Sequence, residues 1–320
     1  FMEFFIILTF LFFFYLNLNN IGINYYKNRF IKLFFSFCIF LIFGSFFSDY
    51  FLNSIRNTLF YFRFGILVLA IWYLLDNYNK FKILFFYFII ITFLILIIST
   101  FLNIVFFEEY IYYNNRISGL FGEELIQGSF VLRTLPIFII FYFYNKENIN
   151  KKFIYIFYII LFSSIFLIII SGERASIFLM LIGIFLMFII LKINLKKIFI
   201  ILSSILIISL SSFSIFPQIK ERVIDRTYKE LFFKYDLENE TKTKKIQLFS
   251  QGHQDHIETG IMIFKNNIIK GVGVRNYRKE CRKDIYKKVG EYYCTTHPHN
   301  TFIQILSETG LIGFIFFISF

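Results

Sequence analysis

Residues 83–103 read ILFFYFIIITFLILIISTFLN, a run without a charged side chain. A helix rises about 1.5 Å per residue, so a helix over this run is about 30 Å long, which matches the hydrocarbon thickness of a bilayer. The run therefore predicts a transmembrane helix, and a chain that is 58% hydrophobic has room for several more.

Apolar runs of similar length recur along the sequence. They predict helices near residues 1–18, 31–47, 59–75, 126–144, 153–171, 175–191, 198–215 and 301–320. The expected fold is all-α. It has a transmembrane bundle of about eight helices over 1–215, a long loop over 216–300, and the start of a further transmembrane helix over 301–320. Because the sequence begins with Phe1 and stops inside an apolar run, we expect it to be a fragment of a longer chain.

The long loop is expected to be partly helical. Helix-like spacing covers Ile219–Tyr235 and His256–Ile269, with a polar loop over 236–251 between them. A turn is expected at Gly271–Gly273, and a basic helix over Asn276–Val289.

The net charge of +12 is explained by membrane topology, and a chain this apolar is a poor candidate for nucleic-acid binding. The odd-numbered loops hold Lys27, Arg29, Lys32, Lys80, Lys82, Lys146, Lys151, Lys152, Lys192, Lys196 and Lys197. The positive-inside rule makes these loops cytoplasmic. The long loop is then outside, which is periplasmic for a multi-pass protein of the bacterial inner membrane.

The basic residues expected outside, before the long loop, are all arginines, which bind phosphate oxygens through two parallel hydrogen bonds. Arg174 sits in the short turn Ser171–Ser176, and either binds an anion, pairs with Glu173 or anchors at the interface. Arg116 precedes a glycine-containing stretch. Arg133 lies inside the next helix, where it needs a partner such as Glu123 or Glu124, or a wet cavity.

The sequence His297-Pro298-His299-Asn300 stands directly before the last apolar run. Asn300 is a good N-cap, which places His299 beside the positive end of a helix dipole and favours a neutral imidazole. His299, with His297 beside it, is therefore a candidate general base, against the alternative of simple solvation. His253 and His256 fit one helix face, where solvated surface is favoured over metal ligation.

Two cysteines, Cys281 and Cys294, fall in the long loop. In an oxidising compartment they can form a disulfide, whereas together with His297 and His299 they have the element types of a zinc site. We favour the disulfide and expect no metal.

Several segments resemble the O-antigen ligase and polymerase family of bacterial membrane glycosyltransferases. The stretch from His297 to Gly313, HPHNTFIQILSETGLIG, looks like the family's His-Asn…Glu-x-Gly-x-x-Gly signature. IIKGVGVRNYR (268–278) looks like its Gly-x-Gly segment, and the stretch from Arg116 to Pro136 looks like its Arg…Gly…Gly…Pro stretch. SGERAS (171–176) is similar to its Ser-Arg hairpin, although Glu173 stands where a small residue is common.

The resemblance implies a glycosyltransferase that takes a glycan from undecaprenyl pyrophosphate and needs no metal, nucleotide sugar or other cofactor. For a ligase the acceptor is lipid A–core, which is the favoured assignment; for a polymerase it is another lipid-linked repeat unit. Arg174, Arg116 and Arg133 would bind the pyrophosphate, and His299 or His297 would be the base. Arg275 and Arg278 would contact the acceptor or anionic headgroups of membrane lipids, unless they are simply solvated. A lipid-linked glycan transporter or a scaffold for glycan-assembly partners is the alternative of another class.

Overall fold

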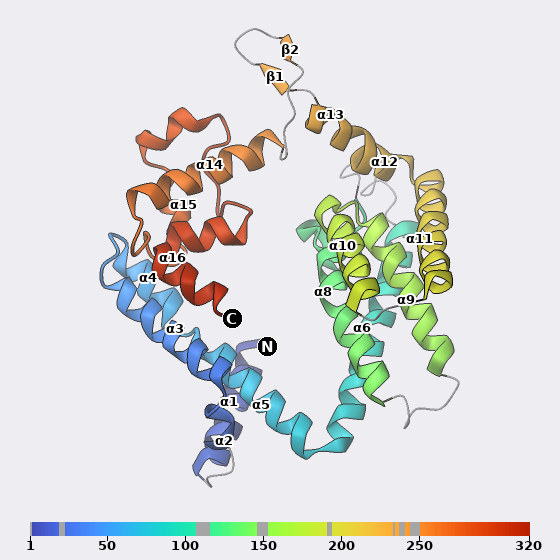
Figure 1. Cartoon of the computed structure of the whole chain (residues 1–320), viewed down its shortest axis with the longest axis horizontal. Coiled ribbons are helices and arrows are strands. Elements are labelled where there is room, and N and C mark those ends of the chain that lie inside the picture. Colours follow the sequence, from blue (N-terminus) through green and yellow to red (C-terminus); the bar gives the residue numbers. More distant parts are fainter. Residues whose placement is uncertain are drawn as a thin grey trace. The chain divides into compact units, whose positions relative to one another are not determined.

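Figure 1 shows the computed structural model, which describes residues 2–18, 23–106, 116–145, 153–190, 194–232, 234–236, 241–243 and 250–320. Helices dominate these residues, and the strands among them form a single small hairpin. Within the described ranges six helical segments are long and apolar enough to cross a membrane. The expected all-α fold is confirmed, and the chain is a multi-pass membrane protein.

Some sequence predictions fall outside the described residues. They include positions 237–240 and 244–249 of the expected polar loop, and four basic residues that the topology prediction used: Lys146, Lys151, Lys152 and Lys192.

The described residues form two compact units. Unit 2 comprises Asn79–Lys229. Its elements are α6 (Asn79–Phe106), η1 (Gly119–Glu124), α8 (Gln127–Asn145), α9 (Phe153–Ile170), α10 (Arg174–Ile190), α11 (Leu195–Ile215), α12 (Pro217–Lys220), the π-helical turn η2 (Glu221–Asp225) and the start of α13 (Arg226–Phe232). Helices α6, α8, α9, α10 and α11 pack into a bundle (Figure 1). Buried aromatic rings such as Phe93 and Phe138 lie in its core.

Unit 1 comprises Phe1–Tyr78 and Glu230–Phe320. Its elements are α1 (Met2–Leu18), α2 (Ile23–Tyr26), α3 (Arg29–Ser45), α4 (Phe51–Thr58), α5 (Phe62–Asn77), the hairpin of β1 (Lys234–Asp236) and β2 (Thr241–Thr243), α14 (Gln251–Asn266), α15 (Tyr277–Glu280), η3 (Asp284–Val289) and α16 (Thr301–Ile318). Helix α16 packs against both the apolar helix α3 and helix α14 of the polar segment. The polar segment is therefore packed against the apolar helices through α16.

Helix α16 is broken, although the sequence predicts a continuous helix. Gly310 has φ 66° and ψ −167°, outside the helical region. Residues 268–273 pair with the backbone at this break. Leu311 N–H donates to the Ile268 carbonyl at 2.7 Å, and Gly273 N–H donates to the Glu308 carbonyl at 2.8 Å. Glycine is required because a Cβ at position 310 would overlap the Ile269 carbonyl group.

The expected basic helix over Asn276–Val289 is wrong. The structure has the single helical turn α15, then a turn, then the 3₁₀ helix η3. Lys283 interrupts the helix with φ −66° and ψ 141°, which is extended backbone. The buried side chain of Glu280 and the disulfide of Cys281 form tertiary contacts here, and these compete with helix propagation.

Candidate functional site

All four histidines of the sequence gather in unit 1. His253 and His256 share one face of α14, and His297 and His299 belong to the loop that enters α16. The ring centroid of His299 lies 4.2 Å from that of His297, 5.1 Å from that of His253 and 5.4 Å from that of His256. We call these four residues the histidine cluster.

The backbone at His299 has a left-handed conformation with φ 52°. Such a conformation costs a non-glycine residue on the order of 1–3 kcal/mol and persists where the surroundings hold it. Asn300 caps α16, because its side-chain oxygen accepts from Ile303 N–H at 3.1 Å. Pro298 is buried on the other side, next to Gly260 of α14. The loop is therefore fixed before and after His299.

Cys281 and Cys294 form a disulfide in the structure. It ties the end of α15 to the segment that leads into the histidine cluster, and it occupies the thiols that the zinc alternative needs. Among the residues that the structure describes, no group of three His, Cys, Asp or Glu side chains is placed to hold a metal ion.

The imidazole of His299 is neutral at neutral pH. Partial burial of the ring, and then the proximity of the three other histidines, lowers its pKa from 6.5 to about 4. Burial, and then the proximity of His253, also lowers the pKa of His256. A neutral imidazole can accept a proton, although a ring with so low a pKa is a weak base until a nearby anion raises that pKa.

Unit 2 holds arginines around the turn between α9 and α10. The Arg116 guanidinium donates to the carbonyl oxygens of Leu125 at 2.9 Å and Ser171 at 3.3 Å. It forms an ion pair of 3.9 Å with Glu173. Burial is the main cause of the lowered pKa of Arg116, and Glu173 opposes that shift.

Glu173, which departs from the family pattern, joins this turn to the start of the earlier helix α8. Its carboxylate accepts from the backbone N–H groups of Gly128 at 2.8 Å and Ser129 at 3.2 Å, at the start of α8. It also accepts from the Ser176 hydroxyl at 3.0 Å. Glu173 thus caps α8 and balances the charge of Arg116.

Arg174 opens α10, and its guanidinium donates to the Thr227 hydroxyl of α13 at 3.3 Å. Arg222, in the π-helical turn η2, donates to the Gly172 carbonyl at 3.1 Å. The sequence gives no sign that Arg222 belongs here, because nothing in its local pattern indicates that η2 folds back onto the turn. We call Arg116, Arg174 and Arg222 the hairpin arginines.

Arg133 lies exposed on α8. Its expected partners Glu123 and Glu124 are exposed on η1.

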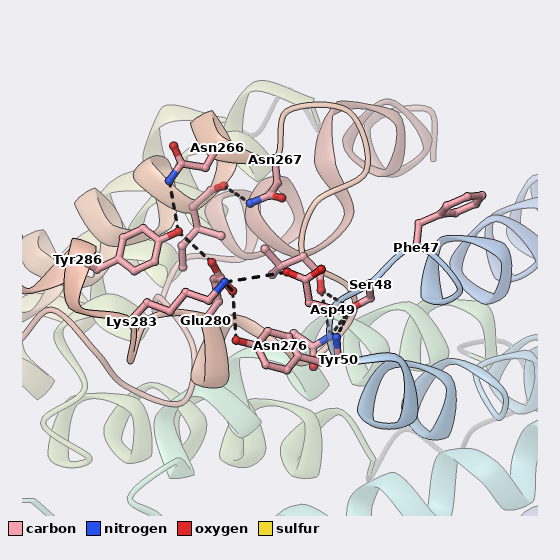
Figure 2. A network of polar contacts seen from close by, with 12 residues as sticks. Phe47, Ser48, Asp49, Tyr50, Asn266, Asn267, Asn276, Glu280, Lys283 and Tyr286 are labelled. Carbon is pink, nitrogen blue, oxygen red and sulfur yellow. Dashed lines mark hydrogen bonds and ion pairs between the residues drawn. The ribbon is translucent and has the colours of Figure 1, made fainter.

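A polar network anchors the segment around α15 to the turn between α3 and α4 (Figure 2). The carboxylate of Glu280 accepts from the hydroxyl of Tyr50 at 3.2 Å, from the hydroxyl of Tyr286 at 3.1 Å, and from the ammonium of Lys283 at 2.8 Å. Asn276 donates to the Ser48 hydroxyl at 3.0 Å. The loop that leads to the histidine cluster is thereby held against unit 1's apolar helices.

Arg275 and Arg278 lie beside this network and differ in their surroundings. Arg278 is exposed on α15. Arg275 has a left-handed backbone with φ 59°, and its guanidinium donates to the Asn57 side chain at 3.2 Å.

Residues 158–318 match the sequence model of the family described as O-antigen ligase, which is half of the chain. The chain belongs to the O-antigen ligase family. O-antigen ligases and polymerases share this family, and lipid-linked glycans are the general substrates it implies. No curated protein and no solved structure matches the chain.

The O-antigen ligase match includes the histidine cluster and two of the hairpin arginines, Arg174 and Arg222. It also includes the paired segments around Gly271 and Gly310, so the Gly-x-Gly segment and the Glu-x-Gly signature are two sides of one contact. Arg116 and Arg133 precede the matched range.

Proposed function

We propose that this protein transfers a glycan from undecaprenyl pyrophosphate to a sugar hydroxyl of lipid A–core, at the periplasmic face of the bacterial inner membrane. The observation that carries the proposal is the neutral His299, held by a capped helix and a buried proline within the family-matched range. The excess of lysine in the odd-numbered loops supports the periplasmic side for the long loop.

His299 is the proposed general base, with His297 as the second candidate. The acceptor oxygen forms a bond to the anomeric carbon of the donor sugar, and the bond from that carbon to the pyrophosphate oxygen breaks. The acceptor's proton goes to a ring nitrogen of His299, and the bonding electrons leave with the pyrophosphate. An anionic donor near the imidazole raises the pKa of His299, which strengthens it as a base in the loaded enzyme.

The hairpin arginines are the proposed partners of the leaving pyrophosphate. Its developing charge is stabilised by fixed cations whose positions require no rearrangement during the reaction. Arg116 and Arg222 are oriented by backbone carbonyls, and Arg174 by Thr227, so each already has a defined direction. Arg133 is a weaker candidate for the same role, and Arg275 and Arg278 are proposed contacts for the acceptor or for headgroups.

The test uses the complete protein in membranes with an undecaprenyl-pyrophosphate-linked oligosaccharide, with and without lipid A–core. A shifted core band on a gel, formed only when lipid A–core is present, is the expected result. His299→Gln and Arg174→Gln should each abolish it, whereas the exposed Lys265→Gln on α14 should leave it intact. Normal transfer by His299→Gln would refute the assignment of the base.

A polymerase is the alternative in the same family, and a ladder of longer lipid-linked glycans formed without lipid A–core would identify it. A transporter is the alternative of another class, and broken helices are typical of transporters. The break in α16 is filled by residues 268–273 of the same unit, which favours a structural role for it.

A further inference from the structure

Unit 1 contains a cavity of about 210 Å³ that is rich in arginine. Arg56, from the last turn of α4, and Arg63, from the first turn of α5, line it together with Arg275 from the Gly-x-Gly segment. Asn57 and three aromatic side chains complete the lining. None of the described residues that line this cavity carries a carboxylate.

Segments far apart in the sequence build this arginine cavity. Arg56 and Arg63 stand on either side of the interruption at residues 59–61, which separates α4 from α5. Arg275 lines the same cavity although it lies more than two hundred positions later in the sequence. Its guanidinium donates to the side-chain oxygen of Asn57 at 3.2 Å, which orients it. Three cations are therefore gathered by tertiary structure, not by a basic run in the sequence.

The backbone of Arg275 is held on both sides. Its N–H donates to the buried carboxylate of Glu308, and its carbonyl accepts from the Asn53 side chain at 3.3 Å. The residue nevertheless has a left-handed φ of 59°, a conformation that is costly for arginine and that clusters at ligand sites. Two tertiary hydrogen bonds thus hold a strained residue in the position that aims its guanidinium at the cavity.

Like charges brought together repel, and the water that reaches the exposed Arg56 and Arg275 weakens this repulsion without abolishing it. An anion removes this cost, and guanidinium groups suit phosphate because they donate two parallel hydrogen bonds to its oxygens. The cavity is smaller than the roughly 300 Å³ at which pockets for drug-sized ligands begin, so it fits a headgroup and not a whole glycan.

We propose that Arg56, Arg63 and Arg275 form a phosphate-binding site in unit 1, distinct from the hairpin arginines of unit 2. The ligand is the phosphate group of a membrane lipid or of a soluble phosphorylated molecule. This inference extends the headgroup role of Arg275 given under the proposed function, but phosphate binding requires neither donor glycan nor transfer.

The first experiment measures binding of inorganic phosphate to the full chain in nanodiscs of phosphatidylcholine by calorimetry. Arg56→Gln and Arg275→Gln should each weaken binding at this site by about tenfold to a hundredfold, because each removes charge-assisted hydrogen bonds. Arg282→Gln, an exposed arginine near Arg275 in the sequence but outside the cavity, is the matched control and should bind as the wild type does.

Arg56 is exposed on α4, so Arg56→Gln should fold normally, and a loss of phosphate binding in this variant is not a sign of misfolding. If phosphate affinity is unchanged in both Arg56→Gln and Arg275→Gln, or is lost only in Arg174→Gln, the site does not exist and the proposal is overturned. Absence of phosphate binding to the wild type in phosphatidylcholine overturns it as well.

A second arm identifies the source of the phosphate by adding phosphatidylglycerol to the nanodiscs. If phosphatidylglycerol weakens phosphate binding to the wild type but leaves binding to Arg275→Gln unchanged, a lipid headgroup occupies the cavity. Unchanged binding means that the ligand is soluble. If no glycan is transferred but phosphate binds as expected, the proposed function is refuted and the phosphate-binding site is retained.

Discussion

Glu173→Ala is expected to lower the free energy of unfolding by about 3 kcal/mol. The carboxylate accepts hydrogen bonds from Gly128 N–H, Ser129 N–H and the Ser176 hydroxyl at 2.8, 3.2 and 3.0 Å, and pairs with Arg116 at 3.9 Å. Only 11% of this side chain is exposed, so water replaces these contacts poorly.

The magnitude follows from these contacts. A hydrogen bond to a charged group contributes about 1.5–3 kcal/mol, and such bonds within one network are not additive. Removing one partner of a buried ion pair costs about 3–5 kcal/mol, and the pair with Arg116 is long and only partly buried, so the lower end applies. Glu173→Gln keeps the shape but turns an NH₂ group toward the α8 donors, and it should cost about 1–2 kcal/mol.

The assay is equilibrium unfolding in mixed micelles, followed by far-ultraviolet circular dichroism. A loss of 3 kcal/mol appears as an unfolding constant raised by about a hundredfold. Tryptophan fluorescence is unsuitable, because the sole tryptophan, Trp72, lies in unit 1. The exposed Glu124→Gln should stay within about 0.5 kcal/mol of the wild type. If Glu173→Ala is equally harmless, the capping role assigned to Glu173 is incorrect.

Four further predictions concern unit 1. The kcat/KM of transfer, which reports the groups of the free enzyme, should stay level from pH 8 to about pH 5 and fall as the pH drops through the His299 pKa of about 4; a fall centred near 6.5 would contradict a depressed pKa in the free enzyme. The unfolded chain takes up this proton first, near 6.5, so stability should also decline between pH 6.5 and 4, by about 1 kcal/mol once solvent screening reduces the full shift. Gly310→Ala should destabilise the protein by about 2–4 kcal/mol in micelle unfolding, because its Cβ overlaps backbone atoms, whereas Gly44→Ala, which meets nothing within 4 Å, should cost under about 1 kcal/mol. Maleimide should label one thiol of the unfolded chain before reduction and three afterwards; three labels at the outset would exclude the Cys281–Cys294 disulfide.

Features that depend on local chemistry could be predicted from the sequence. Apolar runs such as 83–103 predict helices because their length and transfer energy suit a bilayer, and α6 (Asn79–Phe106) contains this run. Asn300 precedes a helix start and caps it through its own side chain, a contact within three residues.

Features that depend on distant partners could not be predicted. The break at Gly310 needs residues 268–273 beside it, and an isolated apolar run gives no sign of that neighbour. His253 and His256 look like any polar helix face until the loop of His299 is folded against them. Arg222 likewise acquires its direction from the Gly172 carbonyl, fifty positions earlier in the chain.

The break in α16 has a consequence for how the protein is made. The chain emerges from the ribosome in order, so Ile268 and Gly273 exist before Leu311 does. By the time α16 is ready to enter the lipid, the groups that pair with its broken backbone have already been synthesised. A rearranged gene that placed α16 first would synthesise Leu311 before Ile268, so the partner of the Leu311 N–H would be absent while α16 forms. Translation in the natural order therefore makes the partners of the break available before α16 is complete.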